Sequence, residues 1–143
     1  MLKKILSVML LAVGIIFSSQ VFVNAAYCPI KGSNFSYESW KSNGYITIRQ
    51  TFVIENISNS TVFVDVDDFV FRKQGFNTVK PGHFGGGFST RLNPPAYINS
   101  HYEMYPGDVL GVSLDYDIDD TTTSGWSLCY RNAGNMIVLA KIK

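Results

Sequence analysis

The sequence predicts an all-β protein, an antiparallel sandwich of about seven to nine strands that follows a cleavable signal peptide. Apolar and polar side chains alternate along two long stretches, 45–71 and 109–118, with the period of half-buried strands. Turn-forming residues recur about every 8 to 12 positions. No helical period after residue 26 lasts more than two turns. These observations together favour strands over helices.

Residues 45–71 are expected to form two strands joined by a polar turn at 56–60. The residues predicted to face inward are apolar and fall on even positions: Ile46, Ile48, Phe52 and Ile54, then Val62, Val64 and Val66. The inward phase then shifts to Phe69 and Phe71. One extra residue would cause this shift, so we expect a bulge or a kink near Asp67 and Asp68.

The other strands are expected on both sides of this pair. Asn43-Gly44 suits a tight hairpin turn and connects an aromatic strand at 35–40 to the strand that begins at Tyr45. The last predicted strands are 109–118, 126–130 and 136–142. Between the pair at 45–71 and the strand at 109–118, glycines and prolines at 72–100 leave room only for short strands at 76–79 and 88–92. The glycines within 82–87 are expected to form a flexible connection.

The N-terminus has the layout of a secretory signal. Lys3 and Lys4 precede an apolar run from Ile5 to Phe17, and Val23-Asn24-Ala25 suits cleavage. We therefore expect a signal peptide at 1–25, one domain at 26–143, and a secreted or periplasmic protein. The alternative is an uncleaved membrane anchor. No later segment is apolar enough to cross a bilayer.

The charge of the mature chain argues against a nucleic-acid partner. Without Lys3 and Lys4, 10 basic residues stand against 11 acidic ones, a formal net charge of −1. Binding of nucleic acid needs a basic surface that replaces counterions.

Two cysteines, Cys28 and Cys129, lie near the two ends of the predicted domain. Because an exported protein can keep a disulfide, we expect them to pair. A bridge across a loop of about 100 residues would stabilise the fold by about 4 to 5 kcal/mol. Two free thiols or an intermolecular bridge are the alternatives.

The order of these features resembles that of a known group. A long strand ends in IENISNS, a second ends in DDFVF, a Pro-Gly turn opens a third, and a strand containing a cysteine lies near the end. Over 45–118 this pattern resembles the small immunoglobulin-like β-sandwich domains of uncharacterised exported bacterial proteins. The resemblance implies an immunoglobulin-like sandwich and assigns no functional residues.

Two groups of aspartates are candidates for a Ca²⁺ site. Asp115, Asp117 and Asp119 share one face of a strand, with Asp120 beside them. The second group is formed by Asp65, Asp67 and Asp68. If the groups met at one end of the sandwich, their oxygens would suit Ca²⁺. The alternative is that these carboxylates only keep exposed faces and edges soluble.

Two further surfaces are candidates for binding. Phe84, Phe88 and Arg91 lie in or near the glycine-rich segment and are candidates for contact with a ligand or a protein partner. The second surface would bind carbohydrate through exposed aromatic rings. The aromatic candidates for it are Trp40, Tyr97, Tyr102, Tyr105 and Trp126. The alternative is that aromatic residues fill the core, because Trp126 alternates with Leu128 and Tyr130 as a core residue would.

The sequence gives little support to catalysis. The two histidines, His83 and His101, fit no known catalytic spacing, and residues 87–91 lack the second glycine of a nucleophile elbow. We therefore expect a non-enzymatic module that has no cofactor. It would contact an unidentified protein or have a structural role, in the cell envelope or outside the cell. A Ca²⁺- or carbohydrate-binding module is the first alternative, and a hydrolase is the least supported one.

Overall fold

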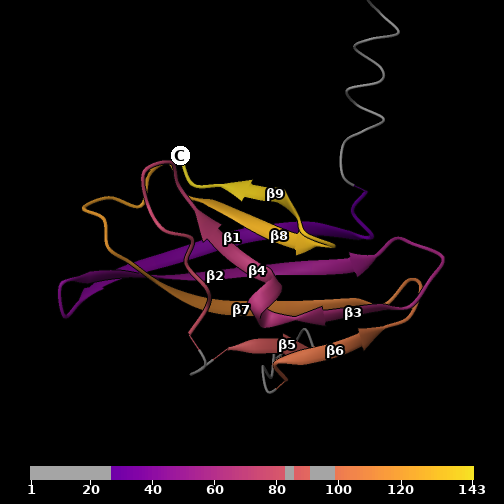
Figure 1. Ribbon diagram of the computed structural model, residues 1–143. Coiled ribbons are helices and arrows are strands. Elements are labelled where there is room, and N and C mark those ends of the chain that lie inside the picture. The colour runs from indigo at the N-terminus through magenta and orange to yellow at the C-terminus, as the bar shows by residue number, and fades with distance from the viewer. Residues whose placement is uncertain (1–26, 83–85, 91–98) are drawn as a thin grey trace, which may run out of the picture.

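The computed structural model describes residues 27–82, 86–90 and 99–143, which form nine strands and one short 3-10 helix (Figure 1). The predicted signal peptide lies outside these residues. In chain order the elements are β1 (Ile30–Ser42), β2 (Tyr45–Asn56), β3 (Val62–Asp65), the 3-10 helix η1 (Val66–Asp68), β4 (Phe69–Arg72), β5 (Gly87–Ser89), β6 (His101–Met104), β7 (Val109–Ile118), β8 (Ser127–Asn132) and β9 (Asn135–Lys141). The predicted all-β class is confirmed.

The strands form three antiparallel sheets. The largest has the order β1-β2-β7-β5, the second β4-β8-β9, and β3 pairs with β6 alone. We call the first sheet A and the second sheet C. Figure 1 shows β8 and β9 lying across β1 and β2, as expected for two packed layers.

The core lies between sheets A and C and is rich in aromatic rings. Tyr116 of β7 stacks on Phe71 of β4 with ring centroids 4.1 Å apart, and its hydroxyl donates a hydrogen bond to the carbonyl of Phe69 at 2.8 Å. The Phe69 ring in turn packs 5.5 Å from that of Phe52 in β2. The alternating apolar residues of both sheets therefore meet across one interface, which confirms the predicted sandwich-like arrangement.

The hairpin between β1 and β2 forms as predicted. Asn43 and Gly44 both have positive φ, 49° and 83°, the backbone that a primed two-residue turn requires. β1 is longer than the predicted strand at 35–40, and a bulge interrupts its pairing between Ser33 and Ser36. The residues before Phe35 carry no alternating pattern, so only their pairing with β2 reveals that they belong to the strand.

The expected irregularity near Asp67 and Asp68 is a turn of 3-10 helix. The Asp65 side chain caps η1 by accepting a hydrogen bond from the backbone N–H of Asp67 at 2.9 Å. The chain thereby changes partner, because β3 pairs with β6 whereas β4 pairs with β8. The phase shift in the sequence marks this change of sheet.

The segment that leads to β5 differs from the expected one. The predicted strand at 76–79 is reduced to one bridge, in which Val79 pairs with Phe71. Gly86 and Gly87 lie so close to the backbones of Ser113 and Asn99 that a Cβ at either position would clash. Gly86 therefore allows β5 to lie close to β7, and Gly87 allows it to lie close to Asn99, within a segment that was expected to be flexible. β5 overlaps the start of the short strand predicted at 88–92.

Candidate contact surface at the hairpin end

The predicted disulfide is not formed. Cys129 follows the core residue Leu128 and precedes the core residue Tyr130, so strand alternation turns its side chain to the outer face of sheet C. Its partners there are Val70 and Val138. Cys28 instead packs against the core, and both cysteines are free thiols. The register of β8 thus turns Cys129 away from Cys28, with which the sequence predicted a disulfide.

The two aspartate groups are distributed over different parts of the fold. Asp65 caps η1 and Asp67 lies within it, whereas Asp115 and Asp117 lie in β7 of sheet A and Asp119 directly follows that strand. Two of the latter have partners within the chain. Arg49 donates to Asp115 at 2.8 and 3.0 Å, and Thr47 donates to Asp117 at 2.6 Å. Across the described ranges, no group of three or more acidic, histidine or cysteine side chains could hold a metal ion.

The three residues expected to contact a partner fall into two groups. Phe88 is fully buried, and its ring packs 5.9 Å from that of Phe69. It is therefore a core residue, not a contact residue. Phe84 and Arg91 lie outside the described residues.

The predicted aromatic platform does not form as one surface. Trp126 is 1% exposed and belongs to the core. Trp40 pairs with Thr47 near the start of β2, whereas Tyr105 lies near its end, where the backbone of Asn56 bonds to that of Asp108. Tyr97 lies outside the described ranges. Trp40 and Tyr105 are thus at opposite ends of the sandwich.

A different set of aromatic side chains gathers where β1 turns into β2. Trp40, Tyr45 and Phe76 are 40%, 49% and 40% exposed. We call the surface formed by these three residues the hairpin end. Sequence reasoning missed Tyr45 and Phe76 as site residues, although Tyr45 occupies an outward position in the alternation of β2.

Three adjoining clefts connect these aromatic residues. A cleft of about 450 Å³ joins Trp40 to the threonines 121–123, and one of about 370 Å³ joins Tyr45 to Lys41 and Thr121. A third, of about 350 Å³, lies between Tyr45 and Phe76. The hairpin, the β7–β8 loop and the segment after β4 therefore present one continuous surface.

The third cleft combines apolar and acidic groups. Its other lining residues are Gly75, Asn77, Val79, Asp117, Asp119 and Trp126. The two aromatic walls can stack on a flat group, and the two carboxylates and the amide beside them can accept hydrogen bonds from polar atoms at the edge of that group. Such a cleft suits a partner side chain or a sugar ring.

Asp120 stabilises the loops at the hairpin end through two side-chain hydrogen bonds. One of its carboxylate oxygens accepts from the Lys73 ammonium at 2.6 Å and from the Trp126 indole N–H at 2.9 Å. The Lys73 hydrogen bond, with that of Trp126, lowers the pKa of Asp120 to about 2. Trp126 in turn packs 5.3 Å from Phe76. The exposed ring of Phe76 is thus held by a charged network.

Trp40 is fixed by a cation at the same end. The guanidinium of Arg49 lies 5.3 Å from the centre of the Trp40 ring while it pairs with Asp115. The hydrogen bond with Asp115 raises the pKa of Arg49 above its ordinary value. A ring held in one orientation loses little entropy when a partner binds.

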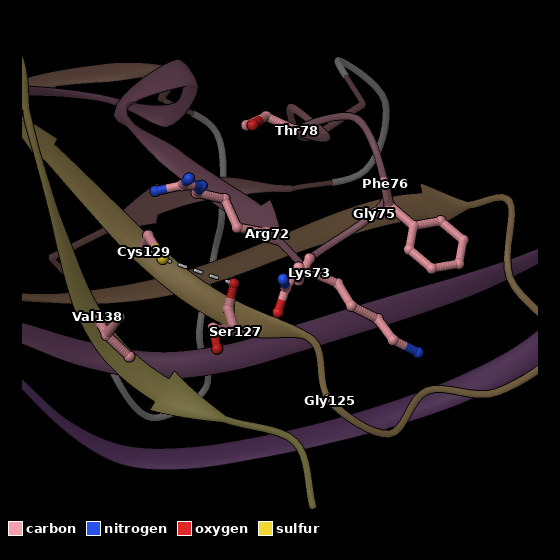
Figure 2. A pocket seen from close by; sticks show the side chains of 10 residues that line it. Arg72, Lys73, Gly75, Phe76, Thr78, Gly125, Ser127, Cys129 and Val138 are labelled. Atoms are coloured by element: carbon pink, nitrogen blue, oxygen red, sulfur yellow. Dashed lines mark hydrogen bonds between the residues drawn. The ribbon is translucent and has the colours of Figure 1, made fainter.

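Beside this surface, a hollow of about 400 Å³ lies on the outer face of sheet C (Figure 2). Figure 2 shows Arg72 projecting on the side of Cys129, while Lys73 and Phe76 project away from it. Gln74, Thr78, Ser127 and Val138 also line the hollow. Arg72 had no signal in the sequence, because only the register of β4 shows which way it projects.

Comparisons with protein-family models, with curated proteins and with solved structures found no match. Within the described part of the chain, no helix has the length and apolarity needed to span a membrane.

Proposed function

We propose that this protein is an exported, non-enzymatic module that binds another protein through the hairpin end. Its place outside the cytoplasm, secreted or periplasmic, rests on the signal-like sequence of residues 1–25. The sheet orders β1-β2-β7-β5 and β4-β8-β9 support an immunoglobulin-like sandwich, because constant-type immunoglobulin domains have the orders ABED and CFG.

The observation that carries this proposal is the grouping of Trp40, Tyr45 and Phe76 along three adjoining clefts. Tryptophan and tyrosine are enriched among the residues that dominate binding energy at protein interfaces. They provide a large contact area with few rotatable bonds. The nearby threonines and charged side chains supply the polar rim that such interfaces have.

Capture with matched variants tests the proposal. The immobilised protein is exposed to envelope extract and culture medium of the producing organism, beside a Tyr45→Ala/Phe76→Ala variant. A Tyr105→Ala variant is the control, because Tyr105 is 58% exposed at the opposite end. We expect a partner that the wild type and the control retain and that the double variant retains at least about tenfold less. Equal retention by all three proteins would reject the proposal.

Carbohydrate binding is the second candidate, because the third cleft sets Tyr45 and Phe76 beside Asn77, Asp117 and Asp119. Aromatic rings that flank carboxylates and an amide can stack on a sugar and bind its hydroxyls. A glycan array distinguishes the two candidates. A signal that Tyr45→Ala abolishes and Tyr105→Ala preserves would favour the sugar over the protein partner.

A further inference from the structure

We infer that the hollow on the outer face of sheet C binds an oxyanion carried by a small organic molecule. This inference goes beyond the proposed protein contact: Phe76 borders both surfaces, but the cationic group of the hollow, Arg72, is not a residue of the hairpin end. The hollow lies over β8, between the end of β4 and the segment that follows it (Figure 2).

The charge of the hollow favours an anion. Its lining includes Arg72 and Lys73 and no carboxylate. Lys73 is already neutralised by Asp120, at 2.6 Å, and projects away from Cys129. Arg72 makes no ion pair with any described carboxylate. A guanidinium presents a rigid fork of donors that matches carboxylate, sulfate or phosphate oxygens.

Uncharged donors surround the same space. The side-chain amide of Gln74 and the hydroxyls of Thr78 and Ser127 line the hollow, and none of them bonds to another described residue. Each can donate to an oxygen atom of a bound anion. Arg72 together with these groups can therefore bind several oxygens at once.

The floor of the hollow does not compete with an anion. Cys129 is 1% exposed, and burial raises the pKa of its thiol above the ordinary value. The thiol is therefore neutral at physiological pH. Its hydrogen bond goes to the carbonyl of Ser127 at 3.8 Å, within its own strand.

The size of the hollow favours an organic molecule over a bare inorganic anion. Its volume of about 400 Å³ lies in the range of small-molecule sites. Phe76 and Val138 give it apolar walls, beside the polar groups near Arg72. An anionic group attached to a small apolar body would contact both kinds of surface.

Titration of the purified protein followed by NMR tests this inference. Sodium benzoate, sodium benzenesulfonate and sodium phosphate serve as probes, with sodium chloride used to hold the ionic strength constant. We expect saturable shifts of the Arg72 Nε–H and the Ser127 amide signals, with tighter binding of the two organic anions than of phosphate. Whether benzoate or benzenesulfonate binds more tightly identifies the preferred oxyanion.

Three variants supply the controls. Arg72→Gln should weaken benzoate binding at least about tenfold, and Arg72→Lys should weaken it less, because the charge remains without the fork. Lys31→Gln removes an exposed charge on β1, outside the hollow, and should change nothing. If Arg72→Gln does not fold, Thr78→Val, which removes only a hydroxyl, should still weaken binding. Shifts that do not saturate, or that persist unchanged in the folded Arg72 or Thr78 variants, would overturn the inference.

Discussion

The two ends of β2, a strand of 12 residues, differ in how far their side chains are buried and bonded within the protein. At its last residue, Asn56 is 1% exposed and uses its whole side chain within the protein. Its amide donates to the carbonyls of Ser60 and Met104, and its carbonyl oxygen accepts twice from Ser58. At the first residue, Tyr45 is 49% exposed beside two clefts.

This difference assigns stability of the fold to the Asn56 end of β2 and binding to the Tyr45 end. The Asn56 end satisfies its polar groups internally, so a substitution there leaves backbone groups without partners. At the hairpin end the exposed rings are supported by neighbouring groups but not covered by them. Such rings contribute little to folding and remain available to a partner.

Asn56→Ala should have the largest effect on stability. It removes the side-chain donor to the Met104 carbonyl and the acceptor of the Ser58 N–H, whereas the Ser58 hydroxyl and the Ser60 carbonyl keep their bond to each other. We expect the free energy of unfolding to fall by about 3 kcal/mol, measured by urea denaturation. Asn59→Ala, in the same exposed turn, is the control and should change it by less than about 0.5 kcal/mol. Equal effects of the two variants would show that the Asn56 network does not hold this end.

The support of the hairpin end should be sensitive to acid. Because its folded pKa of about 2 lies below the unfolded value of about 3.9, Asp120 stabilises the fold above that unfolded value. This contribution should be lost as the pH falls from about 4 to about 2. Denaturation midpoints measured across this range should fall less steeply in Asp120→Asn than in the wild type.

The matched control for this measurement is Asp119→Asn, which removes an exposed neighbouring carboxylate. It should leave the acid-dependent loss in place. An Asp120→Asn variant whose midpoint falls as steeply as that of the wild type would contradict the role given to this carboxylate.

Much of the fold follows from the sequence, and the reason is local. Alternation in 45–56 and 109–118 depends only on the residues of each strand, so β2 and β7 are predicted closely. The Asn43-Gly44 turn is local in the same way. The full length of β1 and the close approach of Gly86 and Gly87 depend on neighbouring strands, and a single segment does not reveal them.

The contact surface could not be predicted for a related reason. It joins Trp40, Tyr45, Phe76 and the 117–123 segment, which are far apart in the sequence and meet only in the folded chain. The error over Cys28 and Cys129 is of the same kind. Their positions near the two ends of the domain suggested a bridge, whereas the register of β8 turns Cys129 to the outer face of sheet C and Cys28 packs against the core.

Tyr45→Ala should have only a small effect on folding. The side chain is half exposed, so the free energy of unfolding should change by less than about 0.5 kcal/mol, again by urea denaturation. A loss above about 2 kcal/mol would make Tyr45 a structural residue and would remove the contrast between the two ends.

Reduction should have the smallest effect of all. Because Cys28 and Cys129 are free thiols, dithiothreitol should leave the unfolding midpoint unchanged, and denatured protein should titrate with two thiols per chain. A disulfide would instead contribute about 4 to 5 kcal/mol that reduction removes. In that case a covalent bond would help hold the start of β1, near Asn56.

The most direct measurement is hydroxyl-radical footprinting of the purified protein with and without its captured partner. It reports the solvent accessibility of each exposed aromatic side chain at both ends of β2 in one experiment. We predict that the partner protects Trp40, Tyr45 and Phe76 while Tyr105 stays as reactive as in the free protein. Protection of Tyr105 with no change at the hairpin end would contradict the account.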